Sequence, residues 1–305
     1  MSDRGRSVLW PSLLVVCSLP TSAAAQERTE SSFPFEPLNA WAVALGGAGA
    51  GKHGAAFSSL NPAALAGERG AELSHRASPI GTRDYAIAAG HAGLWGTLRI
   101  AARRRDWGEI AQDLGIEGLT AGEQSIALTV ADRVIRGRAA WGLSLARLDA
   151  DYLGSRSGTW AADAGAQVYL GRGFGVGVAL LHAGKGFENE GGRAPLPTRI
   201  RPGVAWEGRL GPLHLATAGD LPVPLALDSP PDMHAGVEVG GTWGPVTGAA
   251  RAGYRSLVNR DGSASRQGAW TLGGGIRLGR IAVDIAYTFG IVFGDERFVS
   301  LSLHW

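Results

Sequence analysis

Segments in which apolar and polar side chains alternate recur along most of the chain. In the segment 159–170, the even positions from Trp160 to Leu170 are apolar or small, and the odd positions from Thr159 to Tyr169 are polar or small. The same alternation returns at 281–289 and 297–305. Because successive side chains of a β-strand point to opposite faces, each segment predicts a strand with one apolar face.

We count about 14 such segments, an even number whose lengths suit membrane spans of about ten residues. The predicted strands lie near residues 71–78, 83–92, 94–104, 123–132, 138–148, 159–170, 174–183, 199–207, 213–220, 233–242, 246–255, 269–278, 281–289 and 297–305. After position 25 no apolar run reaches the length of about 18 residues that a membrane-spanning helix needs. The sequence therefore excludes a helical membrane protein.

The connections between these segments alternate between tight and long. Glycine marks the tight ones, at Gly93, 171–173, Gly211 with Pro212, Gly244 with Pro245, and Gly279 with Arg280. The longer ones lie at 105–122, 149–158, 184–198, 221–232, 256–268 and 290–296. Outer-membrane barrels have short periplasmic turns and long external loops, whereas a soluble β-sandwich has no reason to gather its long loops at one end. The predicted fold class is all-β, a closed antiparallel transmembrane β-barrel of about 14 strands.

The N-terminus has the features of a secretory leader. Arg4 and Arg6 precede an apolar run at 8–16, and three alanines end at Ala25. A membrane anchor is the alternative, but the apolar run is only about half as long as a spanning helix. The pattern predicts a signal peptide over 1–25 that is cleaved after Ala25.

The exported chain is expected to comprise an N-terminal plug over 26–69 and a barrel over 70–305 in the bacterial outer membrane. Cys17 is the only cysteine and lies in the leader, so the exported chain would have no disulfide and no cysteine-bound metal. The formal net charge of +2 says nothing about nucleic acid or acidic partners, and no nucleic-acid partner is predicted.

Strand parity assigns the two faces of the barrel. Apolar residues such as Trp160, Trp270 and Leu272 are expected to face lipid. The opposite face carries charges of both signs. The lumen-lining candidates are Asp163, Arg199, Arg201, Glu238, Arg251, Arg277 and Asp284. Two interpretations stay open: a structural lining of ion pairs, because unpaired charges are costly in a low-dielectric space, and a dedicated ligand site.

A glycine-rich segment precedes the predicted barrel. Gly46 with Gly51 and Lys52 has the spacing of a phosphate-binding loop. However, His53 stands where that loop needs a hydroxyl group, and no βαβ pattern surrounds it. Nucleotide binding is therefore not expected, and Gly46 and Gly47 are assigned to a plug.

A fixed turn follows in the same segment. Asn61, Pro62 and Ala63 predict it, because Asn-Pro initiates turns and Pro62 has no backbone N–H to donate. A compact segment of small residues is narrow enough to fold back inside a barrel. The plug motif is therefore Gly46 and Gly47 together with Asn61, Pro62 and Ala63.

The stretch 44–65, with its paired glycines, Phe57 and the run from Leu60 to Leu65, resembles the N-terminal hatch of FadL-like barrels and is closest to the PorV/PorQ branch. Weaker similarity continues at 163–165, 196–199, 236–238, 251–254, 286–287 and 297–300. The resemblance implies a porin-like barrel of about 14 strands with a plugged lumen.

The same resemblance implies one of two roles. The first is passage of small hydrophobic solutes across the outer membrane. The second is a non-transporting part in type IX protein secretion or surface attachment, with secreted proteins as partners. The chain is short for this family and has trimmed external loops.

An enzymatic function is not predicted. No two of the seven histidines are spaced as a metal pair on one element, and the sequence has no G-x-S-x-G elbow. The sequence therefore predicts no catalytic residues, no metal and no cofactor.

The last residue, Trp305, shares the lipid-facing parity of Val299, Leu301 and Leu303. The resemblance implies that a terminal aromatic residue is the signal read by the barrel-assembly machinery. That machinery and outer-membrane lipid are therefore expected partners.

We predict that Trp305→Lys lowers the amount of folded barrel in outer-membrane fractions, measured by heat-modifiable gel mobility, before it impairs any transport. An unchanged folded fraction would contradict this role of Trp305.

Overall fold

The structure is a computed structural model of the 305-residue chain. It describes residues 37–79, 81–107, 121–152, 155–189, 192–225, 231–258, 266–290 and 294–305. The leader predicted over 1–25 and its cleavage site at Ala25 lie outside the described residues.

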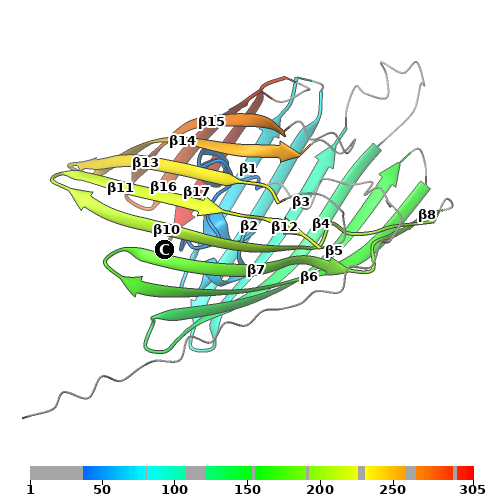
Figure 1. Ribbon diagram of the computed structural model, residues 1–305, viewed down its shortest axis with the longest axis horizontal. Helices are drawn as coiled ribbons and strands as arrows, with labels where there is room; N and C mark the ends of the chain where they lie inside the picture. The colour runs from blue at the N-terminus through cyan, green and yellow to red at the C-terminus, as the bar shows by residue number, and fades with distance from the viewer. Residues whose placement is uncertain are drawn as a thin grey trace, which may run out of the picture.

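Fourteen strands form the wall of a closed antiparallel barrel (Figure 1). Successive wall strands pair with each other, and the last pairs with the first, so that Gly70 lies opposite His304 and Ala77 opposite Arg297. The predicted fold class is confirmed. The wall strands are β1 (Gly70–Ala77), β2 (Arg83–Gly93), β3 (Gly96–Asp106), β4 (Ala121–Val134), β5 (Ala139–Tyr152), β6 (Ser155–Gly171), β7 (Phe174–Gly184), β10 (Arg199–Leu210), β11 (Leu213–Asp220), β13 (His234–Trp243), β14 (Val246–Val258), β15 (Arg266–Leu278), β16 (Ile281–Phe289) and β17 (Glu296–His304).

Three short strands complete the β-structure of the described residues. β12 (Val223–Pro224) pairs with the start of β10, and this pairing brings the main sheet to 15 strands. β8 (Phe187–Asn189) and β9 (Gly192–Ala194) form a separate hairpin in the connection between β7 and β10.

The tight turns gather at one end of the barrel and the longer connections at the other. The prediction of a long loop at 149–158 is wrong, because β5 and β6 stay paired as far as Tyr152 opposite Ser155. This extension carries polar side chains, with Arg156 Nε 2.8 Å from Asp151 Oδ2. A strand pair satisfies its backbone groups whether its side chains are apolar or polar, so the hairpin continues beyond the apolar pattern.

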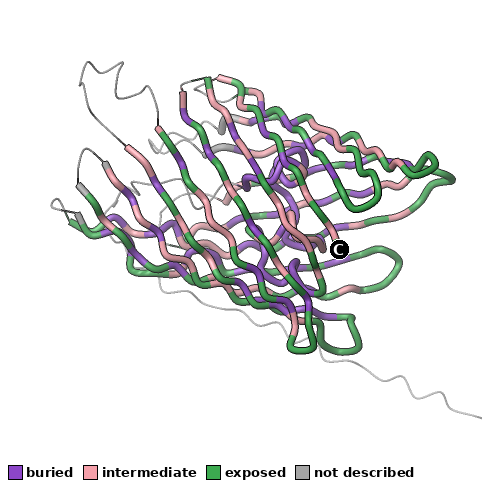
Figure 2. The backbone as a smooth tube through the Cα atoms, turned by 180° about the vertical axis from the view of Figure 1, so that it is seen from behind, coloured by how far each residue is buried: buried purple, intermediate pink, exposed green. Residues whose placement is uncertain are grey.

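Residues 37–66, which we call the hatch, lie inside the barrel. Figure 2 shows them as a densely buried segment within the wall. The hatch contains the short helix α1 (Ala40–Ala44) and the 3-10 turns η2 (Ala55–Phe57) and η3 (Pro62–Leu65). Among the described residues, helices with the length and apolar character needed to cross a bilayer are absent.

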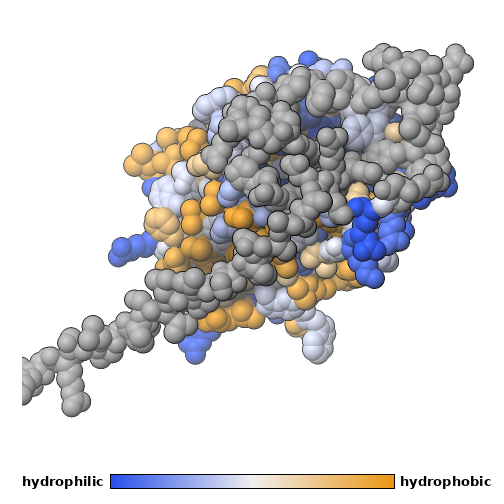
Figure 3. All heavy atoms as spheres, turned by 45° about the vertical axis from the view of Figure 1, so that its right-hand side comes forward, coloured by the Kyte–Doolittle hydropathy of each residue, from blue (hydrophilic) through white to orange (hydrophobic). Residues whose placement is uncertain are grey.

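The outer face of the wall is apolar. Leu272, Ile276 and Val283 are 52%, 62% and 44% exposed, whereas Thr271 and Asp284, which point the other way, are buried. Figure 3 shows hydrophobic residues spread over the visible wall and hydrophilic residues towards its edges. A closed barrel with an exposed apolar band is what contact with lipid requires.

The position of the membrane around the barrel can be tested with charged substitutions at two heights on the outer face of β15. We predict that Leu272→Arg destabilises the folded barrel by about 2–4 kcal/mol, whereas Leu278→Arg, beside a tight turn, costs only about 0–1 kcal/mol. Both leucines are more than half exposed on the same face, so the pair isolates the effect of depth. Urea unfolding in lipid vesicles measures the free energies. Equal losses would contradict the proposed position of the membrane.

Candidate functional site

Helix α1 begins at a polar cap and lies directly on the wall. Asn39 Oδ1 accepts hydrogen bonds from the backbone N–H groups of Trp41 at 2.9 Å and Ala42 at 3.4 Å. These bonds satisfy donors that a helix N-terminus leaves unpaired. The N–H of Ala40 donates to Ser300 Oγ on β17 at 2.9 Å. The small alanine side chains of α1 allow this close approach.

Two glycines turn the chain at the end of α1. Gly46 and Gly47 have φ angles of +68° and +71°, a region that other residues rarely adopt. A Cβ on Gly46 would also lie 2.5 Å from the carbonyl oxygen of Tyr254. The N–H of Gly46 donates to Thr271 Oγ1 at 3.0 Å, and its carbonyl oxygen lies 2.7 Å from His234 Nδ1. The paired glycines therefore meet both a conformational and a steric requirement.

An acidic side chain of the wall holds the middle of the hatch. Asp220, at the end of β11, accepts hydrogen bonds from the backbone N–H groups of Gly49 at 2.8 Å and Ala50 at 3.0 Å. Arg201 on β10 donates to Asp220 at 2.8 Å and also to the carbonyl oxygen of Gly47. Asp220 and Arg201 are both buried. Because a buried charge without a partner is strongly destabilising, these groups depend on one another.

Asn61, Pro62 and Ala63 form the second anchor. Asn61 Oδ1 caps η3 by accepting from the N–H of Ala63 at 3.0 Å, and Pro62 occupies the first position of η3, where no N–H is needed. Asn61 Nδ2 donates to the carbonyl oxygens of Ala50 at 2.8 Å and Ala166 on β6 at 3.2 Å. One buried side chain thus ties both halves of the hatch to each other and to the wall.

The wall meets the hatch at a set of glycines, which we call the glycine contacts. A Cβ at any of them would lie between 1.9 and 2.6 Å from an atom of the hatch. They come from β5, β6, β7, β13, β14 and β15, and they are Gly142, Gly165, Gly177, Gly236, Gly253 and Gly273. Gln167 Nε2 adds hydrogen bonds of 2.9 Å to the carbonyl oxygens of Ala50 and Lys52. The hatch is therefore pressed against these strands with no room for side chains between them.

Three of the lumen candidates form one ion cluster. Arg251 Nη1 lies 2.6 Å from Asp284 Oδ1, and Arg251 Nε lies 2.5 Å from Glu238 Oε2. The guanidinium also lies 4.8 Å from the centroid of the Trp41 ring, a cation–π contact with the hatch. Arg251 is thus bound by two carboxylates and one aromatic ring of the protein itself. This favours the interpretation of the cluster as a structural lining of ion pairs over a ligand site.

The other lumen candidates are spread along the barrel. Asp163 lies where β6 and β7 shift register, and its Oδ1 accepts from the N–H of His182 at 2.6 Å. Arg199 is half-buried at the start of β10, and Arg277 is exposed near the tight-turn end. The seven candidates therefore do not converge on one ligand set. In the described ranges, no group of three or more His, Cys, Asp and Glu side chains is placed to hold a metal ion.

Sequence reasoning missed a further charge cluster. Asp84 on β2 is fully buried and lies 2.7 Å from Arg103, 2.8 Å from Arg105 and 3.2 Å from Arg76. Parity turns Arg103 and Arg105 inward and leaves Arg104 exposed between them. The alternation of the sequence contains this signal, but the partner on β2 follows only from strand pairing.

A cavity of about 170 Å³, which we call the outer chamber, lies between the hatch and strands β2 to β6. Small side chains dominate this part of the wall. They include Ala86, Ala88, Ala101, Ala127, Ser144, Ala146 and Ala161. Ala55, Ala56, Ser58 and Ser59 line the chamber from the hatch. Space remains here because β2, β3 and β4 make none of the glycine contacts and many of the side chains that line the chamber are small.

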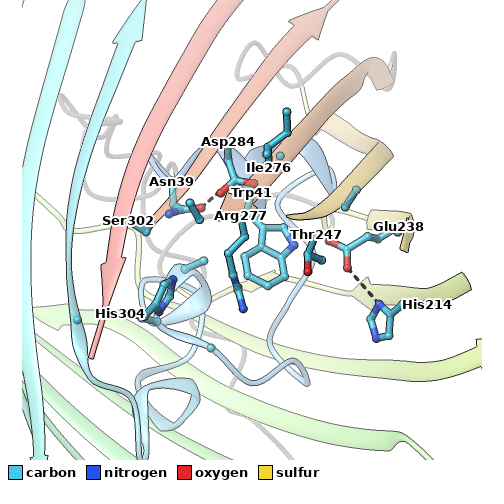
Figure 4. A pocket seen from close by; sticks show the side chains of 18 of the residues that line it. Asn39, Trp41, His214, Glu238, Thr247, Ile276, Arg277, Asp284, Ser302 and His304 are labelled. Carbon is cyan, nitrogen blue, oxygen red and sulfur yellow. Dashed lines mark hydrogen bonds and ion pairs between the residues drawn. The ribbon is translucent and has the colours of Figure 1, made fainter. Parts of the chain in front are cut away.

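A second cavity of about 760 Å³, which we call the vestibule, lies at the tight-turn end. Figure 4 shows Trp41 of the hatch and Arg277 of β15 at its lining. Glu68 also lines it and lies 2.7 Å from His53. Burial by itself raises the pKa of the Glu68 carboxyl, but the hydrogen bond and charge of His53 outweigh burial, so that the pKa is lowered. Charged groups thus line the vestibule.

No protein-family model and no curated protein matches the chain. Among solved structures, it is similar to the CymD monoaromatic hydrocarbon channel, with a TM-score of 0.60 and 13% identity over 88% of this chain and 97% of that chain. The toluene transporter TodX of Pseudomonas putida has a TM-score of 0.52 and 12% identity over 91% of this chain and 98% of its own. The chain has the FadL-like barrel fold.

At these identities the likeness concerns the fold. The fold matches structures named as a hydrocarbon channel and a toluene transporter. The PorV/PorQ branch suggested by the hatch sequence stays a prediction.

The close approach of the wall glycines to the hatch can be tested by adding a side chain at one of them. We predict that Gly165→Ala loosens the hatch, because the added Cβ would lie 2.0 Å from Asn61 Oδ1. Asn61 must then move and lose hydrogen bonds worth about 0.5–1.5 kcal/mol each. Gly219→Ala is the matched control, since its Cβ would have no neighbour closer than 3.8 Å. Limited proteolysis of the folded barrel should cut the hatch faster in Gly165→Ala alone; equal rates in both variants would refute the tight contact.

Proposed function

We propose that this protein is an outer-membrane channel that passes small hydrophobic solutes around a fixed hatch. The observation that carries the proposal is the outer chamber of about 170 Å³. A protein cavity of about 150 Å³ is large enough to bind benzene, so the chamber has the volume for a solute with one aromatic ring. The monoaromatic hydrocarbons and toluene named for the similar channels are solutes of this kind.

The chemistry of the outer chamber also suits a neutral solute. Ala101, Ala127 and Ala146 line it from three successive strands. The hydroxyl groups of Thr129 and Ser144 also line it, and Thr129 donates to Ser144 at 3.0 Å. The charged side chains of the lining are paired, Glu72 with Arg99, Arg103 with Asp84, and Asp163 with the N–H of His182. Transfer of an apolar solute from water is favourable, because apolar surface leaves water and these polar groups already have partners.

Export and assembly belong to the same proposal. The apolar outer face supports an outer-membrane location, to which a leader over 1–25 would direct the chain. Trp305 is 47% exposed beside Leu303, on the face assigned to lipid, as an assembly signal there requires. The hatch sequence supports assignment to the PorV/PorQ type.

A non-transporting role in type IX secretion or surface attachment is the second candidate. The observation that favours it is the hatch, which the glycine contacts hold in the lumen against β5 to β7 and β13 to β15. A barrel whose plug never yields would serve better as a surface for exported proteins than as a channel.

Filling the outer chamber should slow solute passage. Ala127→Phe places a ring in the chamber, whereas Ile126→Phe adds the same ring on the lipid face of the same strand, where Ile126 is 63% exposed. We expect several-fold slower uptake of radiolabelled toluene by cells that produce Ala127→Phe than by cells that produce wild-type protein or Ile126→Phe. Uptake is compared at equal amounts of heat-modifiable barrel.

A strain without the protein sets the background, and deletion of residues 39–66 removes most of the hatch. Toluene uptake that is equal in wild-type, hatch-deletion and null cells would refute the channel and leave the secretion or attachment role.

A further inference from the structure

The outer chamber and the vestibule meet at one group of residues. Six residues line both cavities, and two of these six are charged. They are Asn39, Ala55, Ala56, Glu72, Ala88 and Arg99. Together the cavities extend from the bulge at Asp163 to His304 at the tight-turn end. The side chains that separate the two cavities therefore decide whether a solute crosses the barrel.

Arg99 and Glu72 fill the junction. Arg99 Nη2 lies 3.2 Å from Glu72 Oε2, and Arg99 Nη1 donates to the carbonyl oxygen of Ala55 in the hatch at 2.9 Å. The two charged side chains are only 10% and 14% exposed. Arg99 lies on β3 and Glu72 on β1, so the guanidinium reaches across β2, where their paired residues are the small Gly90 and Ala88.

A chain of hydroxyl groups holds Glu72 in place. Ser74 Oγ donates to Glu72 Oε1 at 2.9 Å, and Ser300 Oγ lies 2.7 Å from Ser74 Oγ. Since Ser74 gives its proton to Glu72, Ser300 is the donor to Ser74. Ser300 Oγ in turn accepts from the N–H of Ala40 at 2.9 Å. Glu72 is thus fixed to the wall and to α1, so the junction opens only if the side chain of Arg99 breaks its bonds to Glu72 and Ala55.

We propose that the Arg99–Glu72 pair is the gate of the channel. A solute passes from the outer chamber to the vestibule only when the guanidinium leaves Glu72 and Ala55. The glycine contacts hold the hatch in place, so the gate opens by rotation of one side chain and not by withdrawal of the hatch. When closed, the pair also blocks ions, because a narrow charged constriction is an electrostatic barrier. This inference rests on the proposed function.

Ion conductance tests the gate without any hydrophobic solute. Wild-type protein and the double variant Glu72→Ala with Arg99→Ala are reconstituted in planar lipid bilayers with potassium chloride on both sides. We expect several-fold higher conductance for the double variant, because loss of both side chains joins the two cavities. Wild-type conductance from a double variant with heat-modifiable mobility would overturn the gate.

The double variant Arg147→Ala with Asp149→Ala is the control. It removes another pair of opposite charges, in which Arg147 Nη2 lies 2.7 Å from Asp149 Oδ1, but neither residue lines the outer chamber or the vestibule. Its conductance should equal that of the wild type. A rise as large as that of the gate variant would show general loosening of the lumen and would overturn the proposal.

Arg99→Cys provides a second variant in case the double variant does not fold. The only native cysteine, Cys17, lies in the predicted leader, so this variant offers one thiol in the exported chain. Its conductance should exceed that of the wild type. It should fall when a methanethiosulfonate reagent places an ethylammonium group at position 99, as the thiolate forms a disulfide with the reagent and methanesulfinate leaves. Conductance that stays unchanged after complete labelling would contradict the gate.

Toluene uptake separates this proposal from the proposed function. If wild-type cells take up no more toluene than null cells while the conductance differences hold, the solute is wrong and the gate stands. If wild-type cells take up toluene and the gate variants match the wild type in both measurements, the channel stands and the gate is refuted.

Discussion

Closure of the barrel through β1 and β17 is the constraint on which the rest of the structure depends. Lipid offers no hydrogen-bond partners, so every backbone N–H and carbonyl of the wall must pair within the wall. The pairing from Gly70 opposite His304 to Ala77 opposite Arg297 removes the last free edge. Once the wall is closed, its inner face can be polar, and the chain fills part of the lumen with its own N-terminal segment.

The hatch meets the same requirement by using side chains of the wall. Its short helix and turns leave many backbone groups without local partners. Asp220 accepts two of the N–H groups, Thr271 accepts one and donates to a carbonyl, and Gln167 donates to two further carbonyls. Such bonds need short distances, which explains why the wall has glycine at the contacts. The same closeness holds the hatch against the wall, so the proposed route for solutes runs beside it.

Much of the fold follows from local sequence. Alternation predicted the wall strands and the direction of their side chains, because parity is a property of each strand alone. It failed at 149–158, where β5 and β6 continue with polar residues whose pairing needs no apolar face. Gly46, Gly47 and Asn61 were identifiable because a positive φ and an Asn-Pro turn require particular residues. The gate was not, since Arg99 and Glu72 lie 27 residues apart on strands that are not neighbours, and neither stands out in the pattern.

The sequence by itself therefore determined a β-barrel with an apolar outer face, a charged lumen and a compact segment of small residues ahead of the wall. Only the tertiary structure decided which charges meet and where space remains. Side-chain direction is set within one strand, whereas an enclosed volume depends on the wall strands and the hatch together. The glycine contacts hold the hatch against β5 to β7 and β13 to β15, the small side chains of β2 to β6 leave space for the chamber, and η2 brings Ala55 to Arg99.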